Sequence, residues 1–326
     1  MVERKEYLDQ LWMWKDEQQI KVVTGIRRCG KSVLLEQYQQ RLLEDGVTPQ
    51  QIISINFENL DYEHLKDYRA LYTYLKERLC PDKMTYIFLD EIQEVQHFEK
   101  VVDSLYIRED VDIYITGSNA YMLSGELATL LSGRYIEIKM LPLSFREYTV
   151  VTGLSKEEAF AEFMKTGGIP YVAVMNRTDE KVDQYLEGIY NTVIIKDIEQ
   201  RQARREITGD RRKITDITLL KTVARYLASV IGSPVSIKSI TNYLISSGRK
   251  VSQNTVNDYV EALTESFIFY PVERFDIVGK QLLKTNNKFY MVDMGIRNHI
   301  LPRKQYDLGF TIENIVYLEL ERRGNK

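Results

Sequence analysis

Residues 25–32 read Gly25-Ile26-Arg27-Arg28-Cys29-Gly30-Lys31-Ser32, which fits the pattern G-x-x-x-x-G-K-[ST] at every fixed position. Glycine suits such a loop because backbone N–H groups must wrap closely around a phosphate, and a Cβ atom would block the approach. The β-rich run 20–24 precedes the loop and a helical pattern follows it, which is the context that the motif requires. We therefore expect residues 25–33, ending at Val33, to bind the phosphates of a nucleotide.

The residues inside and at the end of this loop have separate expected roles. Lys31 supplies a mobile positive charge for the β- and γ-phosphates, and Ser32 supplies a hydroxyl group for Mg²⁺. The positive end of the following helix faces the anion. Arg27 and Arg28 are further candidates for phosphate contact, although loop arginines also commonly face solvent. Cys29 is expected to fill space.

A second motif, Tyr86-Ile87-Phe88-Leu89-Asp90-Glu91, is an apolar strand pattern that ends in two acids. Burying adjacent carboxylates is costly unless a cation or a reaction uses them. We expect Asp90 to hold the magnesium ion and Glu91 to act as the general base that activates the attacking water. The alternative is a pair of solvated acids at a strand end, which the position after a phosphate-binding loop disfavours.

Short β-rich runs alternate with helical patterns in the first half of the chain. The runs cover residues 20–24, 52–57, 86–89, 113–116 and 135–138, and the helical patterns cover 32–45, 65–79 and 98–107. This alternation predicts an α/β fold with a parallel sheet and helices on both faces, the fold of a P-loop NTPase. Residues 144–197 predict helices only, which would form a connector.

The β-rich run 113–116 leads into Thr116-Gly117-Ser118-Asn119-Ala120. In a parallel sheet its carboxyl end lies beside the γ-phosphate, so Ser118 or Asn119 is expected to hold the attacking water or to sense the phosphate. The alternative is that these residues cap a following helix.

Residues 216–293 predict a compact unit of a different kind. Helical patterns at 216–231, 237–245 and 252–266 precede two β-rich runs at 268–272 and 288–292, and this order predicts a winged helix-turn-helix. The candidate contacts to double-stranded DNA are Lys238, Arg249, Lys250, Gln253, Asn254 and Lys284. Against DNA binding, the helix at 252–266 carries three acids and no Lys or Arg. A lid or a partner surface is therefore the alternative.

The composition is that of an ordinary globular chain of 326 residues, with 44% hydrophobic and 28% charged side chains. It excludes collagen-like, mucin-like and largely disordered proteins. Two cysteines are too few for a disulfide framework, and no apolar run approaches the ~20 residues that span a bilayer. We expect a cytoplasmic protein without a membrane partner. The net charge of −3 conceals a basic segment, 201–250, with 11 basic and 3 acidic side chains.

Four stretches together resemble a known family. GIRRCGKSVLL, FLDEIQ, ITGSNAYMLSGELATLLSGRYIEI and PLSFREY, in this order, resemble the predicted AAA-type ATPases of bacteria and archaea. The resemblance implies a strand inserted between the two motif strands, and it places Arg134 where related ATPases carry an arginine finger. Such a finger would act in trans in a homo-oligomer. The alternative is that Arg134 pairs with local carboxylates.

The resemblance also implies a C-terminal domain related to restriction-endonuclease-like folds. Residues 309–326 resemble its opening helix, with Glu313 at the acidic position, and the metal-binding residues would lie beyond Lys326. We expect four parts: an ATPase domain (1–143), a helical lid or connector (144–214), a winged helix (215–295), and a linker with the truncated first helix of the nuclease-like domain (296–326).

The expected function is that of a Mg²⁺-dependent ATPase that acts as a nucleotide-driven switch, with ATP as its substrate and DNA as a partner of the winged helix. Two alternatives stay open. One is a DNA-binding regulator that uses ATP only as a structural ligand. The other is the targeting part of a nucleic-acid-processing enzyme.

Overall fold

The computed structural model describes residues 2–117, 131, 133–193, 216–273, 286–301 and 307–324. The chain forms two compact units, each with its own sheet. The first unit comprises Met1–Gly25 and Cys29–Met140, and the second comprises Ile26–Arg28 and Leu141–Lys326.

The first unit is built on a five-stranded parallel sheet with the order β2-β3-β4-β1-β5. Its strands are β1 (Ile20–Thr24), β2 (Ile52–Asn56), β3 (Thr85–Asp90), β4 (Val111–Gly117) and β5 (Tyr135–Lys139). Every pair in this sheet is parallel. The predicted α/β class is confirmed, and β4 lies between the two motif strands β1 and β3, as the resemblance implied.

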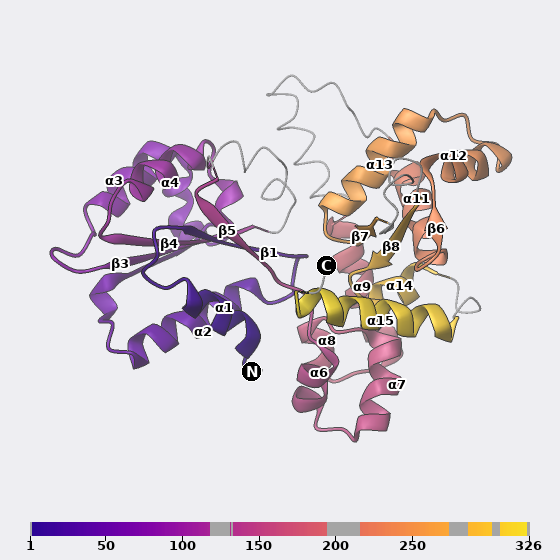
Figure 1. The fold of residues 1–326 in the computed structure, drawn as a ribbon, viewed down its shortest axis with the longest axis horizontal. Coiled ribbons are helices and arrows are strands. Elements are labelled where there is room, and N and C mark those ends of the chain that lie inside the picture. The colour runs from indigo at the N-terminus through magenta and orange to yellow at the C-terminus, as the bar shows by residue number, and fades with distance from the viewer. Residues whose placement is uncertain are drawn as a thin grey trace, which may run out of the picture. The chain divides into compact units, whose positions relative to one another are not determined.

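Helices cover both faces of this sheet. In Figure 1, α1 (Lys5–Met13) and α2 (Lys31–Glu44) lie on one face, and α3 (Tyr68–Lys76) and α4 (Phe98–Tyr106) lie on the other. Short 3₁₀ turns occupy Pro49–Gln51, Leu60–Lys66 and Ile92–Glu94. Helix α3 begins later than predicted because the Asp67 carboxylate caps it, accepting hydrogen bonds from Arg69 N and Ala70 N.

The two faces of the sheet differ in character. Alternate strand residues under α3 and α4, including Ile20, Val22 and Ile113, form an apolar core. The opposite face carries a buried ion pair, in which Lys21 Nζ on β1 donates to Asp112 Oδ1 on β4 at 2.5 Å. Burial lowers the pKa of Lys21 and raises the pKa of Asp112, and their mutual attraction opposes both shifts.

The second unit begins with helices alone, as predicted for this region. They are α6 (Phe145–Thr152), α7 (Lys156–Thr166), α8 (Pro170–Val174) and α9 (Asp179–Asn191). Capping boxes start two of them, because the Ser144 and Ser155 hydroxyl groups accept from the N–H groups of Glu147 and Glu158.

Three helices and a small antiparallel sheet follow in the second unit. They are α11 (Ile217–Ser229), β6 (Pro234–Val235), α12 (Ile237–Ser246), α13 (Gln253–Glu265), β7 (Phe269–Val272) and β8 (Asn287–Met291). The sheet order is β6-β8-β7. The predicted three helices and hairpin are present, and Ser252 is the N-cap of α13. The two-residue strand β6 was not predicted.

Two further helices complete the described chain, α14 (Met294–Ile300) and α15 (Leu308–Arg322). Helix α15 is joined to β8 through Asn314, whose side-chain amide accepts from Met291 N at 2.7 Å and donates to Met291 O at 2.8 Å. Within the described ranges, no helix combines the length and apolar character needed to cross a membrane.

Candidate functional site

The loop that joins β1 to α2 has glycines with positive φ angles at both of its ends. Gly25 has φ of 151°, and a Cβ atom on it would lie 2.2 Å from the Met140 carbonyl oxygen. Gly30 has φ of 104° and is the N-cap of α2, where it offers no side chain to cap the helix. The loop therefore needs glycine at both positions, and the positive end of α2 lies at the loop.

Lys31 links the loop to the second motif. Its side chain is buried, with 4% of the residue exposed. Nζ donates to Gly25 O at 3.2 Å and lies 3.7 Å from Glu91 Oε1. The two motifs, predicted separately from the sequence, therefore meet at this ammonium group.

The Asp90 carboxylate at the end of β3 is held from three sides. Oδ2 accepts from Asn56 Nδ2 at 2.8 Å, and Oδ1 accepts from the Thr116 hydroxyl group. The Ser32 hydroxyl group also hydrogen-bonds to this carboxylate. Burial raises the pKa of Asp90 above its ordinary value, whereas the bonds from Ser32 and Thr116 oppose that shift.

Glu91 follows Asp90 in a left-handed backbone conformation, with φ of 54°. Its N–H donates to Thr116 Oγ1 at 2.9 Å, and its carboxylate accepts from the Gln93 side-chain amide. A non-glycine residue in this conformation costs of order 1–3 kcal/mol and persists only where its surroundings fix it. Such backbone strain concentrates at functional sites.

Three residues in this cluster were not assigned a role from the sequence: Asn56, Gln93 and Thr116. Asn56 pairs with Asp90 in the register of β2 and β3, and Thr116 lies on β4, the other neighbour of β3. The available signal was a polar side chain at the carboxyl end of each neighbouring strand. To recognise this signal one must know which strands are neighbours of β3, and the order of the motifs in the sequence does not give the strand order.

Arg134 lies at the opposite end of the strands from the loop of its own chain. Its carbonyl accepts from the N–H of Ile20, the first residue of β1, whereas the loop follows Thr24, the last one. The Arg134 guanidinium group lies 3.8 Å from Asp103 Oδ1 and over the Tyr106 ring, 5.2 Å from its centroid. The structure therefore does not bring Arg134 to the loop of the same chain, and the local carboxylate named as the alternative is present.

The remaining predicted loop and strand-end residues are placed as follows. Ile26 and Cys29 are buried, Arg27 and Val33 are half-buried, and Arg28 is exposed. Burial raises the pKa of the Cys29 thiol, which agrees with a space-filling role. Ser118 and Asn119 lie outside the described residues.

The candidate DNA contacts in the second unit differ in accessibility. Lys238, Lys250, Gln253 and Asn254 are exposed, and Lys284 lies outside the described residues. Arg249 is half-buried, and its Nη1 lies 3.6 Å from Asp216 Oδ2. Glu313 Oε1 on α15 accepts from Lys288 Nζ at 2.8 Å and from Tyr290 OH at 2.7 Å, so this acid is engaged with β8.

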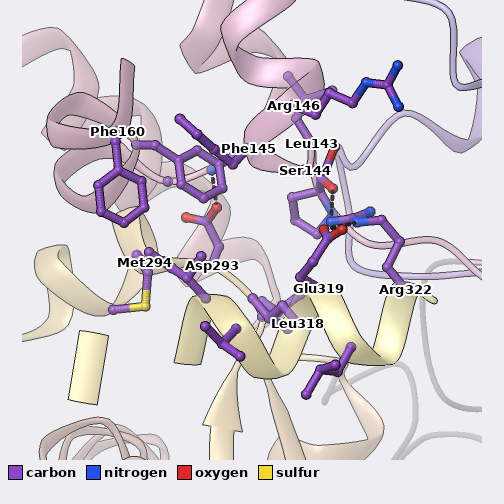
Figure 2. A pocket seen from close by; sticks show the side chains of 18 of the residues that line it. Leu143, Ser144, Phe145, Arg146, Phe160, Asp293, Met294, Leu318, Glu319 and Arg322 are labelled. Atoms are coloured by element: carbon purple, nitrogen blue, oxygen red, sulfur yellow. Dashed lines mark hydrogen bonds and ion pairs between the residues drawn. The ribbon is translucent and has the colours of Figure 1, made fainter. Parts of the chain in front are cut away.

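The second unit contains a cavity of about 400 Å³ between α6, α7 and α15. Figure 2 shows Phe145, Phe160 and Leu318 at its lining, with the Asp293 carboxylate near the two rings. The cavity is mostly apolar, and its one fully buried acid is held by backbone N–H groups.

Asp293 joins two parts of the second unit. Its carboxylate accepts from Gly168 N at 2.6 Å and from Ile296 N at 3.0 Å. A Cβ atom on Gly167 would lie 2.1 Å from Asp293 Oδ1, so the turn that follows α7 needs glycine there. Burial raises the pKa of Asp293 to about 6. We assign this carboxylate to the packing of α14 against that turn.

Two family models match the chain. One is an AAA domain, which matches residues 17–149, and the other is a domain of unknown function (DUF8612), which matches residues 157–307. The first covers the five-stranded sheet and both motifs.

Relatives and solved structures extend this similarity over nearly the whole chain. An uncharacterized protein of Haemophilus influenzae is 38% identical over 331 residues, covering 99% of this chain and 80% of that protein. Uncharacterized protein MJ1544 of Methanocaldococcus jannaschii is 29% identical, covering 94% and 67%. The Walker-type ATPase PABY2304 of Pyrococcus abyssi has a similar fold, with a TM-score of 0.55, 16% identity, and coverage of 92% of this chain and 96% of that one. By its 38% identity over nearly its whole length, this chain belongs to the same family as the Haemophilus influenzae protein, and its residues 17–149 form an AAA domain.

Proposed function

We propose that this protein binds ATP at residues 25–33 and hydrolyses it with Glu91 as the general base. The observation that carries the proposal is the meeting of both motifs at one point, where Lys31 Nζ lies 3.7 Å from Glu91 Oε1. Glu91 and Asp90 are adjacent in sequence, and Thr116 bonds to both of them. A module that only binds ATP needs no base beside the metal acid.

The residues at the site also fit Mg²⁺. Ser32 and Asp90 present hydroxyl and carboxylate oxygens that already hydrogen-bond to each other, and these hard oxygen ligands are the type that Mg²⁺ prefers. When bound, the ion neutralises charge on the phosphates. Asn56 and Thr116 orient the Asp90 carboxylate toward this position.

The contacts of Lys31 support a nucleotide-driven switch. Its Nζ contacts Gly25 O and lies near Glu91, and the β- and γ-phosphates would compete for the same ammonium group. Moving Lys31 to the phosphates leaves Glu91 with fewer local contacts, so the base becomes available to water when substrate is present. Ser118 or Asn119, following β4, is proposed to contact that water or the γ-phosphate.

Arg134 is proposed to act on a neighbouring copy of the chain. Its distance from the loop along β1 and β5 disfavours a role in its own site. Its contact with Asp103 is long, 3.8 Å, and partly exposed, so releasing the guanidinium group from Asp103 should cost little stability. An arginine at this position would stabilise charge that develops on the transferred phosphoryl group.

Binding of duplex DNA by the second unit is a second candidate function. The element order of α11, α12, α13 and the β7–β8 hairpin supports a winged helix. DNA binding is favoured by the exposure of four candidate contact residues: Lys238, Lys250, Gln253 and Asn254. The domain boundaries after residues 143, 214 and 295 also stay proposals. So does the assignment of α15 to a nuclease-like domain. Fluorescence anisotropy with a DNA duplex over a series of salt concentrations tests this binding. Absence of binding at low salt would contradict a DNA-binding role of the winged helix.

ATP binding is tested by calorimetry on the full chain with Lys31→Ala. We expect this variant to lose ATP binding. Lys165→Ala is the matched control, because Lys165 Nζ pairs with Asp179 on the exposed surface of the second unit. ATP affinity that is equal in Lys31→Ala and in the wild type would overturn the assignment of the loop.

A further inference from the structure

A fully buried arginine near the N-terminus donates a hydrogen bond to the backbone of the loop at residues 25–32. Arg4 immediately precedes α1 and is 2% exposed. Its Nη1 donates to the Cys29 carbonyl at 3.1 Å. No sequence motif pointed to this residue, and it belongs to neither of the two motifs that form the site.

The segment that carries Arg4 is fixed on α2, the helix that follows the loop. Arg4 N donates to Gln37 Oε1 at 3.2 Å, and Gln37 Nε2 donates to Val2 O at 2.8 Å. The Arg4 guanidinium group also lies over the Tyr7 ring, 5.0 Å from its centroid. The guanidinium group therefore approaches Cys29 from a backbone that is itself held in place.

The bond to Cys29 controls the orientation of a particular N–H group. The Cys29 carbonyl and the Gly30 N–H belong to one planar peptide unit, and in a trans peptide they point in opposite directions. No peptide bond among the described residues is cis. With the Cys29 carbonyl directed at Arg4, the Gly30 N–H points away from Arg4. Rotating this peptide unit would break the bond to the guanidinium group.

We propose that Arg4 is a positioning residue that holds the Cys29–Gly30 peptide so that the Gly30 N–H faces the phosphates. This inference rests on the proposed ATP site. Burying a guanidinium group is costly unless it makes strong hydrogen bonds, and its bond to the loop carbonyl is of the charge-assisted kind. Its charge also acts on the loop: burial raises the pKa of the Cys29 thiol, whereas Lys31 and Arg4 both oppose that shift.

The test uses the full chain with Arg4→Met, which keeps an unbranched apolar stem and removes the donor. We measure the affinities for ATP and for pyrophosphate, the KM and kcat of ATP hydrolysis, and the melting temperature. We expect both affinities to fall about tenfold, because the variant loses one hydrogen bond from a charged group. KM should rise in parallel, and kcat should change less than KM. Arg4→Lys, which keeps a charged donor, should restore part of the loss.

The control is Gln37→Leu, which loosens the attachment of residues 2–4 and leaves the guanidinium group itself intact. A purely structural Arg4 predicts that both variants lower the melting temperature and leave pyrophosphate affinity unchanged, and that result would overturn the inference. If Arg4→Met does not fold, Arg4→Gln takes its place, since its amide ends two bonds short of the guanidinium nitrogen. Unchanged pyrophosphate affinity in folded Arg4→Gln also overturns it. A wild type that binds neither ATP nor pyrophosphate overturns the proposed function as well.

Discussion

Asn56 and Asp90 lie opposite each other on neighbouring parallel strands, and the Asn56 amide donates to Asp90 Oδ2 at 2.8 Å. The other carboxylate oxygen accepts from Thr116 on the strand at the other side. Both neighbours of β3 therefore orient one acid, and they do so at the edge of the sheet where the loop begins. This arrangement explains how a carboxylate at a strand end becomes a fixed part of the site.

Thr116 has two partners, and its removal should affect both acids. Thr116→Val keeps the shape of the side chain but leaves Asp90 Oδ1 without its donor and the Glu91 N–H without its acceptor. We expect ATP hydrolysis to fall about tenfold or more, and the free energy of unfolding to fall by about 1–3 kcal/mol. Steady-state phosphate release and urea unfolding measure the two effects. Thr116→Ser, which keeps the hydroxyl group, should retain most of the activity, and equal losses in both variants would argue against this role.

Arg134 gives a prediction about assembly. Arg134→Ala should lose at least about 100-fold in ATP hydrolysis if the group stabilises the phosphoryl transition state. Its long contact with Asp103, with 43% of the Arg134 side chain exposed, implies little loss of stability. Mixing Arg134→Ala protein with Lys31→Ala protein should restore part of the activity, because one copy then supplies the loop and the other the arginine. No recovery at any mixing ratio would contradict a trans role.

The buried Asp293 predicts a pH dependence of stability. Its pKa of about 6 in the folded protein exceeds the ordinary 3.8, so between these values the folded chain holds a proton that the unfolded chain has released. Stability is therefore gained as the pH falls through 6 and lost as it rises. From pH 7 to pH 5 we expect a gain of about 1 kcal/mol that Asp293→Asn lacks.

Urea unfolding at pH 7, 6 and 5, followed by circular dichroism, measures this difference. Asp307→Asn is the control, because Asp307, the N-cap residue of α15, is exposed whereas Asp293 is buried. The same pH slope in the wild type and in Asp293→Asn would show that other groups carry the effect.

The sequence predicted the elements that repeat a local pattern and missed the contacts that join distant ones. The loop at residues 25–32, the acids Asp90 and Glu91, and all five parallel strands follow from local signals: glycines, hydrophobic runs and their spacing. Asn56, Thr116 and Arg4 carry no such signal. The roles of Asn56 and Thr116 depend on the strand order. The role of Arg4 depends on a contact with Cys29, which lies 25 residues further along the sequence.

Some local predictions also differed because one side chain changed an element boundary. The helical spacing at 65–79 continues through residues that the structure places in a 3₁₀ turn, because the Asp67 side chain caps the helix. Helix α1 was missed because its apolar positions follow a charged start that has no capping side chain among the described residues. The contact of Arg4, the residue before α1, with the Cys29 carbonyl is visible only in three dimensions.

Hydrolysis by Glu91 is the claim on which the proposed switch depends. Glu91→Gln keeps the size and polarity of the side chain and removes its basic carboxylate. We predict that this variant binds ATP with the affinity of the wild type, and that phosphate release falls about 100-fold or more, the contribution of a positioned base. Phosphate release that is unchanged in Glu91→Gln, while Lys31→Ala abolishes ATP binding, would contradict the account: the protein would then bind ATP without using Glu91 to hydrolyse it.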